Sequence, residues 1–339
     1  MSRYLVTGAT GFLGGHLCAT LRAHGHDVVA LVRAESDALA AIGVEQRRGD
    51  VLDEASVFAV ADRCEGLFHC AGRVSLDPAD AEELHRLHVV GTRTVLDGAQ
   101  RAGVRRVVIA STSGTVAVST AIDKVSRETD EAPLALLARW PYYRTKLFAE
   151  QEALARNALG FEIVSVNPSL LLGPGDLRGS STEDVRLFLE RRVPATPSGG
   201  LSFVDVRDAA EAMLLAMERG VGGERYLVTA ANLTVSAFFS RLERISGVKA
   251  PWLPMPHAPS LTKAGLDFFE RVLRRGGLSL PVDPIRVELG SHTWYADSTK
   301  AETVLGWRAR DPGETLADTV RDLRERGVVW PEMNDGPPL

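Results

Sequence analysis

The first two-thirds of the chain alternate short apolar runs with longer stretches in which apolar residues recur at helical spacing. The apolar runs are rich in β-branched residues, predict strands, and lie at 4–8, 27–33, 44–51, 66–72, 104–112 and 161–168. The helical stretches include 13–25, 81–103 and 141–159. Strands that alternate with helices of this length predict βαβ units, and continuous apolar strands suit a sheet buried on both faces. We therefore expect an α/β fold built on a doubly wound parallel sheet.

The pattern changes after Pro168. Residues 173–200 are rich in Gly, Pro, Ser and Arg, which predicts a long loop of the kind that forms lids or binding surfaces. A strand and a helix return over 201–218, and 231–330 is mostly helical in pattern. Apolar side chains within 252–273 either line an apolar substrate pocket or form a core, and the sequence favours neither.

These changes predict two lobes and a short tail. The expected division is a Rossmann-type NADP-binding domain of residues 1–167 plus 201–230, a smaller and mostly helical C-terminal substrate lobe of residues 168–200 plus 231–330, and a frayed tail of residues 331–339.

Composition narrows the class of protein. The chain has 339 residues, of which 45% are hydrophobic and 24% charged, and a net charge of −5 with both signs interspersed. This balance argues against nucleic-acid and membrane-surface partners. The cysteines, Cys18, Cys64 and Cys70, show no paired spacing, which argues against a disulfide framework. No apolar run approaches the ~18 residues of a membrane span, so we expect a soluble, cytoplasmic protein.

A glycine-rich stretch follows the first strand. In "VTGATGFLGGHL", Gly8, Gly11 and Gly14 are spaced G-x-x-G-x-x-G at the start of the first helix. Glycines there allow a tight turn and a close backbone approach to a pyrophosphate, and the helix N-terminus offers free N–H groups to the phosphates. At this place in a βαβ series the motif predicts nucleotide binding.

The end of the second strand bears on which dinucleotide binds. A carboxylate there would bind the 2′-hydroxyl of NAD, whereas an arginine accommodates the 2′-phosphate of NADP. The chain has Arg33 at this position and no acid before Glu35, so we predict a preference for NADP, with NAD possible. Asp50 and Val51, which end the third strand, are expected near the adenine.

The stretch "YYRTK" begins a predicted helix after Pro141. Tyr142 and Lys146 are four residues apart and therefore lie on one face of that helix, whereas Tyr143, the rival phenol, lacks this spacing. An ammonium beside a phenol stabilises the phenolate, so we expect Lys146 to lower the pKa of Tyr142. Such a phenol can give a proton to a carbonyl oxygen while a hydride arrives from a nicotinamide.

With these features together, the sequence resembles the extended short-chain dehydrogenase/reductase family, and most of all its dihydroflavonol-4-reductase-like branch. The landmarks are "TGATGFLG" (7–14), "GDV" (49–51), "HCAG" (69–72), "HVVGTRTVL" (88–96), "VVIASTSGTV" (107–116), "YYRTK" (142–146), "NPSLLLGPGD" (167–176), "FVDVRDAA" (203–210) and "DSTKAETVLGWRAR" (297–310). The branch includes NADPH-dependent ketone and aldehyde reductases and proteins described as sugar epimerases.

The resemblance implies roles for individual residues. Tyr142 would be the proton donor, Lys146 its ribose-binding partner and Thr112 the catalytic hydroxyl, with Ser113 the alternative if the register shifts by one. The positions that match cofactor contacts, together with Tyr142 and Lys146, are Gly8, Thr10, Gly11, Phe12, Leu13, Arg33, Asp50, Val51, Ala71, Gly72, Pro168 and Ser169. Family dimers often pair through the helix of the tyrosine and the one before it, which makes a homodimer possible here.

Three departures from the family pattern bear on function. His88 stands where the family usually has Asn, and Asn167 stands where it usually has Arg before the proline. The "TVAVS" stretch lacks the tyrosine that sugar epimerases usually have at this point. This last departure weighs against a nucleotide-sugar enzyme, as does Arg33.

Other chemistries lack the residues they need. The eight histidines are scattered without a matching ligand set, so no metal site is expected, and no G-x-S-x-G elbow supports a serine hydrolase. The leading expectation is an NADPH-dependent oxidoreductase that reduces a small, largely apolar ketone or aldehyde to an alcohol. The alternatives are an NAD-dependent sugar epimerase or dehydratase and a regulatory protein that binds NADP(H) without chemistry.

Overall fold

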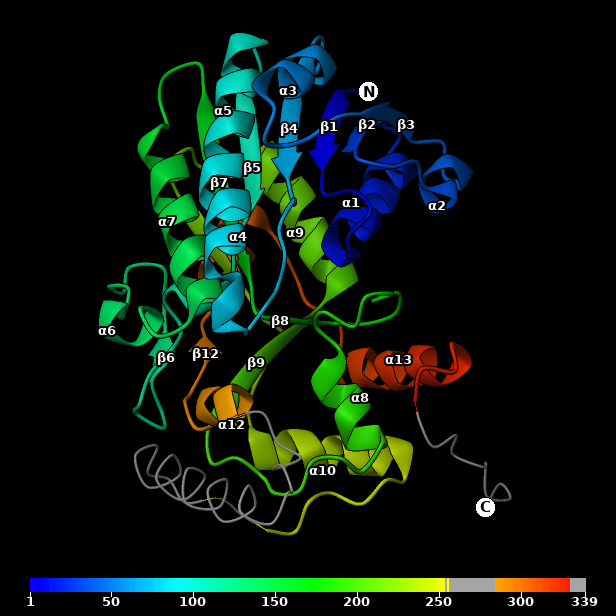
Figure 1. Ribbon diagram of the computed structural model, residues 1–339, viewed down its shortest axis with the longest axis vertical. Helices are drawn as coiled ribbons and strands as arrows, with labels where there is room; N and C mark the ends of the chain where they lie inside the picture. Colours follow the sequence, from blue (N-terminus) through cyan, green and yellow to red (C-terminus); the bar gives the residue numbers. More distant parts are fainter. Residues whose placement is uncertain (254, 256–283, 330–339) are drawn as a thin grey trace.

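A parallel sheet of seven strands forms the centre of the protein in a computed structural model, which describes residues 1–253, 255 and 284–329 (Figure 1). Its order is β10-β7-β5-β4-β1-β2-β3, and every neighbouring pair is parallel. The strands are β1 (Arg3–Thr7), β2 (Asp27–Val32), β3 (Glu45–Arg48), β4 (Gly66–His69), β5 (Arg106–Ala110), β7 (Glu162–Pro168) and β10 (Arg225–Val228). The order reverses beside β1, as in doubly wound sheets, so the predicted fold class is confirmed.

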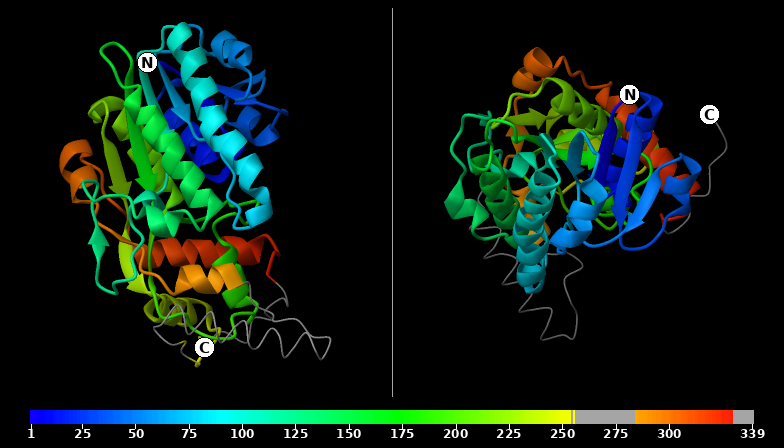
Figure 2. Two further views of the ribbon diagram at one scale, coloured as in Figure 1. Left: turned by 60° about the vertical axis from the view of Figure 1, so that its left-hand side comes forward. Right: turned by 90° about the horizontal axis from the view of Figure 1, so that it is seen from above.

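Helices cover both faces of this sheet (Figure 2). Those of the main domain are α1 (Phe12–Ala23), α2 (Asp37–Ala41), α3 (Glu54–Ala61), α4 (Ala81–His85), α5 (Gly91–Arg101), α7 (Pro141–Ala155) and α9 (Val206–Arg219). Successive strand residues point to opposite faces: Val6 joins the core under α1 and α9, and Leu5 joins the core under α3 and α5. This double burial explains why the inner strands are largely apolar, whereas the edge strand β3 is polar and not buried.

The long helix predicted at 81–103 contains an irregularity. A π-helical turn, Arg86–Val90, joins α4 to α5 without a break in the chain direction. Such turns hold one extra residue, change the direction of the side chains that follow, and often occur at functional sites. Here the turn carries His88.

The second part of the protein lies beyond the carboxyl ends of the main strands (Figure 1). It contains a three-stranded sheet of order β11-β9-β8, a two-stranded pair of β12 and β6, and several helices. These elements are β6 (Val125–Ser126), α6 (Leu134–Leu137), β8 (Leu170–Leu172), α8 (Glu183–Leu189), β9 (Gly200–Asp205), β11 (Ala231–Thr234), α10 (Val235–Ser246), α12 (Pro284–Gly290), β12 (Tyr295–Ala296) and α13 (Pro312–Glu325). Phe188, Phe203, Phe238 and Leu316 are buried in its own core.

Strand pairing divides the segment 201–230, which the sequence analysis placed with the cofactor domain. Strand β9 pairs with β8 and β11 in the smaller sheet, whereas α9 packs against α1, and β10 joins the seven-stranded sheet. The smaller lobe therefore contains strands as well as the predicted helices. The expected tail, 331–339, and most of 252–273 lie outside the described residues. Over the described ranges, no helix is long and apolar enough to span a membrane.

Candidate functional site

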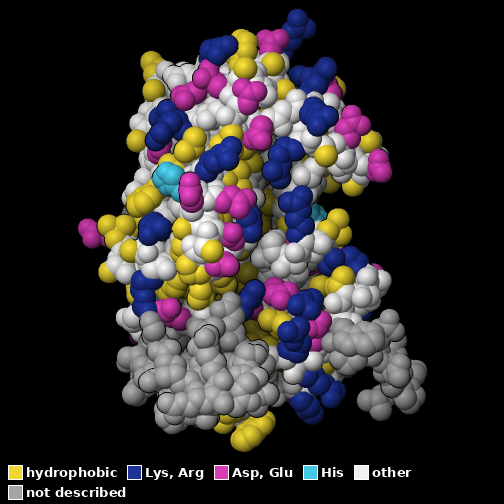
Figure 3. All heavy atoms as spheres, viewed as in Figure 1, with side chains coloured by type: hydrophobic (Ala, Val, Ile, Leu, Met, Phe, Trp, Pro, Cys, Tyr) yellow, Lys and Arg dark blue, Asp and Glu magenta, His cyan; other side chains and the backbone are white. Residues whose placement is uncertain are grey.

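A cleft of about 1710 Å³ opens at the carboxyl ends of the main strands, and residues of both lobes line it. The predicted site residues all lie along it: Gly8, Thr10, Gly11, Phe12, Leu13, Arg33, Asp50, Val51, Ala71, Gly72, Thr112, Ser113, Tyr142, Lys146, Pro168 and Ser169. Figure 3 shows hydrophobic side chains between the charged ones at the centre of the molecule. The structure thus brings all of these predicted residues into one cavity, although the first, Gly8, and the last, Ser169, are 161 positions apart in the sequence.

The glycine-rich loop leaves no room for side chains. Gly8 has φ +71°, and a Cβ atom there would lie 2.5 Å from the backbone nitrogen of Ala71. A Cβ atom on Gly14 would lie 2.2 Å from the carbonyl oxygen of Gly8. The first turn of α1 follows Gly11, which provides no side-chain cap, so its free N–H groups can bind an anion. The cradle therefore fits the diphosphate of a dinucleotide.

Arg33 lies at the end of β2 on the rim of the cleft and is exposed. No carboxylate lies within ion-pair distance of its guanidinium among the residues that the structure describes. Asp50 follows β3, the strand next to β2. Its Oδ1 accepts a hydrogen bond of 2.9 Å from the backbone N–H of Leu52. Arg33 is thus a cation available to a ligand.

Tyr142 and Lys146 lie in the first turns of α7, whose N1 position is Pro141. Lys146 donates a 2.6 Å hydrogen bond from Nζ to the carbonyl oxygen of Ala110. Burial lowers the pKa of Lys146 to about 8. Burial also raises the pKa of Tyr142 to about 12, although part of its ring faces the cleft. The predicted lowering of this pKa is therefore wrong, because the loss of hydration on burial favours the neutral phenol.

Three hydroxyl residues follow β5. Ser111 donates its hydroxyl to Oε2 of Glu150, beneath the cleft. Thr112 caps the 3₁₀ turn Ser113–Thr115, because its Oγ1 accepts a 3.2 Å hydrogen bond from the N–H of Gly114. Thr112 keeps its own O–H hydrogen for a ligand, and Ser113 also lines the cleft. Both hydroxyls that the sequence left as alternatives therefore remain candidates.

A buried polar cluster beneath these hydroxyls was not predicted. Glu150, one turn of α7 beyond Lys146, is 1% exposed. Its Oε2 accepts a 2.6 Å hydrogen bond from Nδ2 of Asn167, and its Oε1 lies 3.0 Å from the guanidinium of Arg225. The signal was present in the sequence, because Tyr142, Lys146 and Glu150 recur every four residues on one helix face.

The cleft wall beside Tyr142 is aromatic. The rings of Tyr142 and Tyr143 lie 5.0 Å apart, and the ring of Tyr143 lies 4.8 Å from that of Trp294. A Cβ atom on Gly114 would be 2.3 Å from the Tyr143 ring, so a glycine is needed behind it. Phe238 and Phe239 of α10, Leu289 and Trp294 also line the cleft on the substrate-lobe side.

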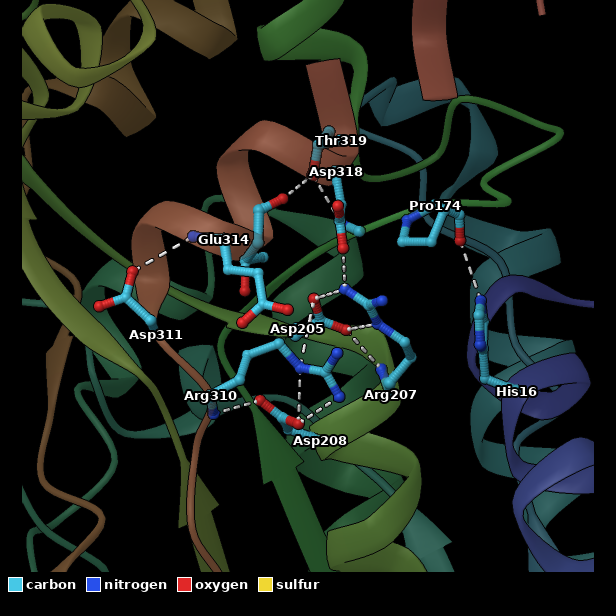
Figure 4. Close-up of polar contacts among 12 residues, drawn as sticks. His16, Pro174, Asp205, Arg207, Asp208, Arg310, Asp311, Glu314, Asp318 and Thr319 are labelled. Atoms are coloured by element: carbon cyan, nitrogen blue, oxygen red, sulfur yellow. Dashed lines mark hydrogen bonds and ion pairs between the residues drawn. The ribbon is translucent and has the colours of Figure 1, made fainter. Parts of the chain in front are cut away.

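The loop after β8 is held from both lobes (Figure 4). His16 of α1 lies with Nε2 2.9 Å from the carbonyl oxygen of Pro174, so this nitrogen carries the hydrogen. The N–H of Gly173 donates to Oγ1 of Thr319 on α13 at 2.8 Å. The loop therefore connects α1 of the main domain to α13 of the smaller lobe.

An ion-pair network supports that loop from below (Figure 4). Asp205 is fully buried, caps α9 through the N–H of Arg207 and accepts two further hydrogen bonds from the Arg207 side chain. Arg207 also bonds Asp318 of α13, and Arg310 bonds Asp208. Such paired charges fix the junction between the lobes. Neither this network nor any other part of the described ranges has a group of three or more His, Cys, Asp or Glu side chains that could hold a metal ion.

Comparison with known proteins yields one family and many relatives. The sequence model of the NAD dependent epimerase/dehydratase family matches residues 4–229. The chain is 36% identical to a Synechocystis protein named "Putative dihydroflavonol 4-reductase", with 96% of each covered. It is 34% identical to sterol demethylase protein B of Methylococcus capsulatus, with 96% of this chain and 99% of the relative covered. It is also 34% identical to a 4-hydroxy-2-methyl-3-oxo-4-farnesyl-3,4-dihydroquinoline-1-oxide ketoreductase of Stigmatella aurantiaca, with 96% and 97% covered.

Solved structures have the same fold. The crystal structure of gox2253 matches with a TM-score of 0.83 and 27% identity, covering 97% of this chain and all of that one. MoeE5 in complex with UDP-glucose and NAD matches with a TM-score of 0.73 and 25% identity, covering 96% and 99%. The similarity extends over both lobes.

Proposed function

This chain belongs to the NAD-dependent epimerase/dehydratase family of extended short-chain dehydrogenases/reductases, and we propose that it is an NADPH-dependent reductase of a largely apolar ketone or aldehyde. That it is an NAD(P)-dependent oxidoreductase follows from the family and its reductase relatives. The observation that carries the proposal is that Tyr142, Lys146 and Thr112 line the same cleft as the glycine-rich cradle and an aromatic wall.

The protonation states of the site suit reduction. With a pKa of about 12, the Tyr142 phenol holds its proton at neutral pH and can give it to a carbonyl oxygen. With a pKa of about 8, Lys146 is charged there and favours the phenolate that forms. Thr112, or Ser113 beside it, donates a hydrogen bond that orients the same oxygen. The nicotinamide, when bound, supplies the hydride to the carbonyl carbon.

The residues present fit a dinucleotide, and Arg33 favours its phosphorylated form. The bare backbone of the glycine-rich loop and the start of α1 would hold the diphosphate. Arg33, exposed at the strand end without a carboxylate partner in the described ranges, would bind the 2′-phosphate of NADP. Lys146, fixed at the end of β5, would face the nicotinamide ribose.

The substrate side of the cleft favours an apolar molecule. Tyr143 and Trp294, both half-buried, present ring surface there, and the buried Phe238 and Phe239 also border the cleft. A cleft of about 1710 Å³ is larger than the ~300–1,000 Å³ usual for one drug-sized ligand, which leaves room for a cofactor and a substantial substrate together. The reductase names of the Synechocystis and Stigmatella relatives agree with this reading.

The epimerase alternative is supported by the family name and by the MoeE5 complex with UDP-glucose and NAD. A sugar needs hydrogen-bond partners for several hydroxyls, and the wall beside Tyr142 offers ring surface instead. A regulatory protein would bind NADP(H) without turnover of any carbonyl. An epimerase should therefore act on nucleotide sugars, whereas a regulatory protein should turn over neither sugars nor carbonyl compounds.

The assay follows NADPH oxidation by the purified protein with a panel of ketones and aldehydes of graded size and polarity. We expect turnover of apolar members, and we expect Tyr142→Phe to lower kcat by about 10³-fold with the Kd for NADPH unchanged. Tyr226→Phe serves as the matched variant, because this buried tyrosine lies away from the cleft, where its hydroxyl accepts a hydrogen bond from the N–H of Val221. Full activity of Tyr142→Phe, or turnover of nucleotide sugars alone, would refute the proposal.

A further inference from the structure

His88 lies between the cofactor side and the catalytic side of the cleft. It belongs to the π-helical turn that joins α4 to α5, is 2% exposed, and lines the cleft with one edge. Its ring meets the Tyr142 ring edge to face, with the centroids 5.8 Å apart. A histidine in this place has no role in the reaction as described above.

Both ring nitrogens of His88 are used. The backbone N–H of Arg73 donates a 3.2 Å hydrogen bond to Nε2. Because a backbone N–H can only donate, Nε2 is the acceptor and the ring hydrogen of the neutral imidazole lies on Nδ1. Nδ1 lies 2.9 Å from Oγ1 of Thr145, and this hydroxyl donates in turn to the carbonyl oxygen of Pro141 at 2.9 Å. The chain of bonds therefore selects one neutral tautomer.

The surroundings keep this imidazole neutral. Burial and the nearby Lys146 ammonium, with a smaller effect of His69, lower the pKa of His88 to about 3. Protonation would place a hydrogen on Nε2 against the N–H of Arg73 and remove the acceptor. The groups that face the ring are thus Lys146 and Tyr142 from α7, His69 from β4 and the backbone of Arg73.

The two bonds join elements that carry different parts of the site. Arg73 directly follows Ala71 and Gly72, which lie on the cofactor side of the cleft, and a Cβ atom on Gly72 would be 3.4 Å from Nε2 of His88. Thr145 lies between Tyr142 and Lys146 in α7. His88 is therefore the side chain through which the loop after β4 contacts the first turns of the catalytic helix.

We propose that His88 is a positioning residue, which fixes the cofactor loop through Arg73 and the catalytic helix through Thr145, and so sets the distance between a bound nicotinamide and the Tyr142 phenol. This inference rests on the proposed reductase function. An error of about 1 Å in such a distance can cost about 10²-fold in rate, so this contact is worth testing.

The two bonds can be broken separately. His88→Phe keeps an aromatic ring, although a larger one, and removes both, whereas Thr145→Val keeps the bond to Arg73 and removes the one to α7. We expect His88→Phe to raise the Kd for NADPH, measured by fluorescence titration, about tenfold and to lower kcat about 10–100-fold. We expect Thr145→Val to lower kcat about tenfold while the Kd for NADPH stays within about twofold.

Matched variants lie on α4 and α5, the helices on either side of the turn that carries His88. His85→Phe changes an exposed histidine of α4, and Thr94→Val removes an exposed hydroxyl of α5 that bonds the carbonyl oxygen of Val90. Neither residue is placed in the site, so both should behave as wild type. The assay uses the carbonyl compound of the panel that wild-type protein reduces fastest, and melting curves report whether each variant is folded.

The results separate positioning from simple packing. A folded His88→Phe variant with wild-type kcat and Kd, whatever its melting temperature, would overturn the proposal, and so would equal rises of Kd in His88→Phe and Thr145→Val. If His88→Phe fails to fold, His88→Asn keeps an acceptor near Arg73, and Thr145→Val alone still decides the contact to α7. If wild-type protein reduces no carbonyl, the reductase function fails, while the comparison of NADPH affinities still decides the contact to the cofactor loop.

Discussion

Lys146 donates its Nζ hydrogen bond to the carbonyl oxygen of Ala110, the last residue of β5, at 2.6 Å. The ammonium is therefore held at the carboxyl end of a central strand, one helical turn from Tyr142. A carbonyl oxygen carries only a partial charge and does not neutralise the ammonium as a carboxylate would. Its positive charge thus remains available to the Tyr142 phenolate that the proposed reduction would form.

The pH dependence of activity should follow the ionisation of the Lys146 ammonium. Burial lowers its pKa to about 8, so the side chain is charged below that pH and loses its charge as the pH rises through it. We expect kcat/KM for carbonyl reduction to be level from about pH 6 to 7.5 and to fall above about pH 8. The measurement is a pH profile of wild type beside Lys146→Arg, whose side chain stays charged. A wild-type profile that remains level to pH 9.5 would contradict the assignment.

The cofactor preference should depend on Arg33. Removing the guanidinium in Arg33→Ala removes a charge-assisted contact of about 1.5–3 kcal/mol to the 2′-phosphate. We therefore expect the Kd for NADPH to rise about 10–100-fold and the Kd for NADH to change less than twofold. Arg105→Ala, an exposed arginine just before β5 at the opposite end of the strands, is the control. An equal rise in the Kd values for NADPH and NADH would show that Arg33 does not bind the 2′-phosphate.

The catalytic hydroxyl can be assigned by a pair of variants. If Thr112 orients the carbonyl oxygen, Thr112→Val should lower kcat about 10²-fold and Ser113→Ala less than about fivefold. Thr112 also caps a short turn, so melting temperatures are recorded for both proteins. The reverse order of effects on kcat, in folded proteins, would move the role to Ser113.

The buried carboxylate of Glu150 should matter for stability. Glu150→Leu leaves Arg225 without its ion-pair partner and removes the shortest hydrogen bond of Asn167, which should cost about 3 kcal/mol of the free energy of unfolding. We expect calorimetry to show a clear fall in melting temperature. The double variant Glu150→Leu with Arg225→Met, which removes both charges, should recover part of it. A single variant as stable as wild type would show that the pair contributes nothing.

Much of the fold could be predicted because the inner strands of the main sheet are buried on both faces and therefore consist largely of apolar residues. The glycine spacing identified the phosphate loop because backbone contact allows no side chain at Gly8 or Gly14. The same apolar signal could not place β9, since a buried strand looks alike in either sheet. The π-helical turn at Arg86–Val90 was also missed, because one extra residue per turn hardly changes an apolar pattern.

The chemistry of the site was less predictable than its location. The four-residue spacing placed Tyr142 and Lys146 in one cleft, but the direction of the Tyr142 pKa depends on how much water the fold removes from it. The partners of Glu150 come from β7 and β10, and sequence spacing does not show contacts over such separations. His88 drew attention only as a departure from the family pattern, whereas its two bonds are visible in the structure.

The chain crosses between the two lobes several times. It leaves the seven-stranded sheet after β7 to form β8 and β9, returns for α9 and β10, and leaves again at β11. No single cut in the backbone can therefore release either lobe as a complete folding unit. A protease that nicks one of the connecting loops should therefore yield fragments that remain associated, because each lobe contains chain segments from both sides of the nick.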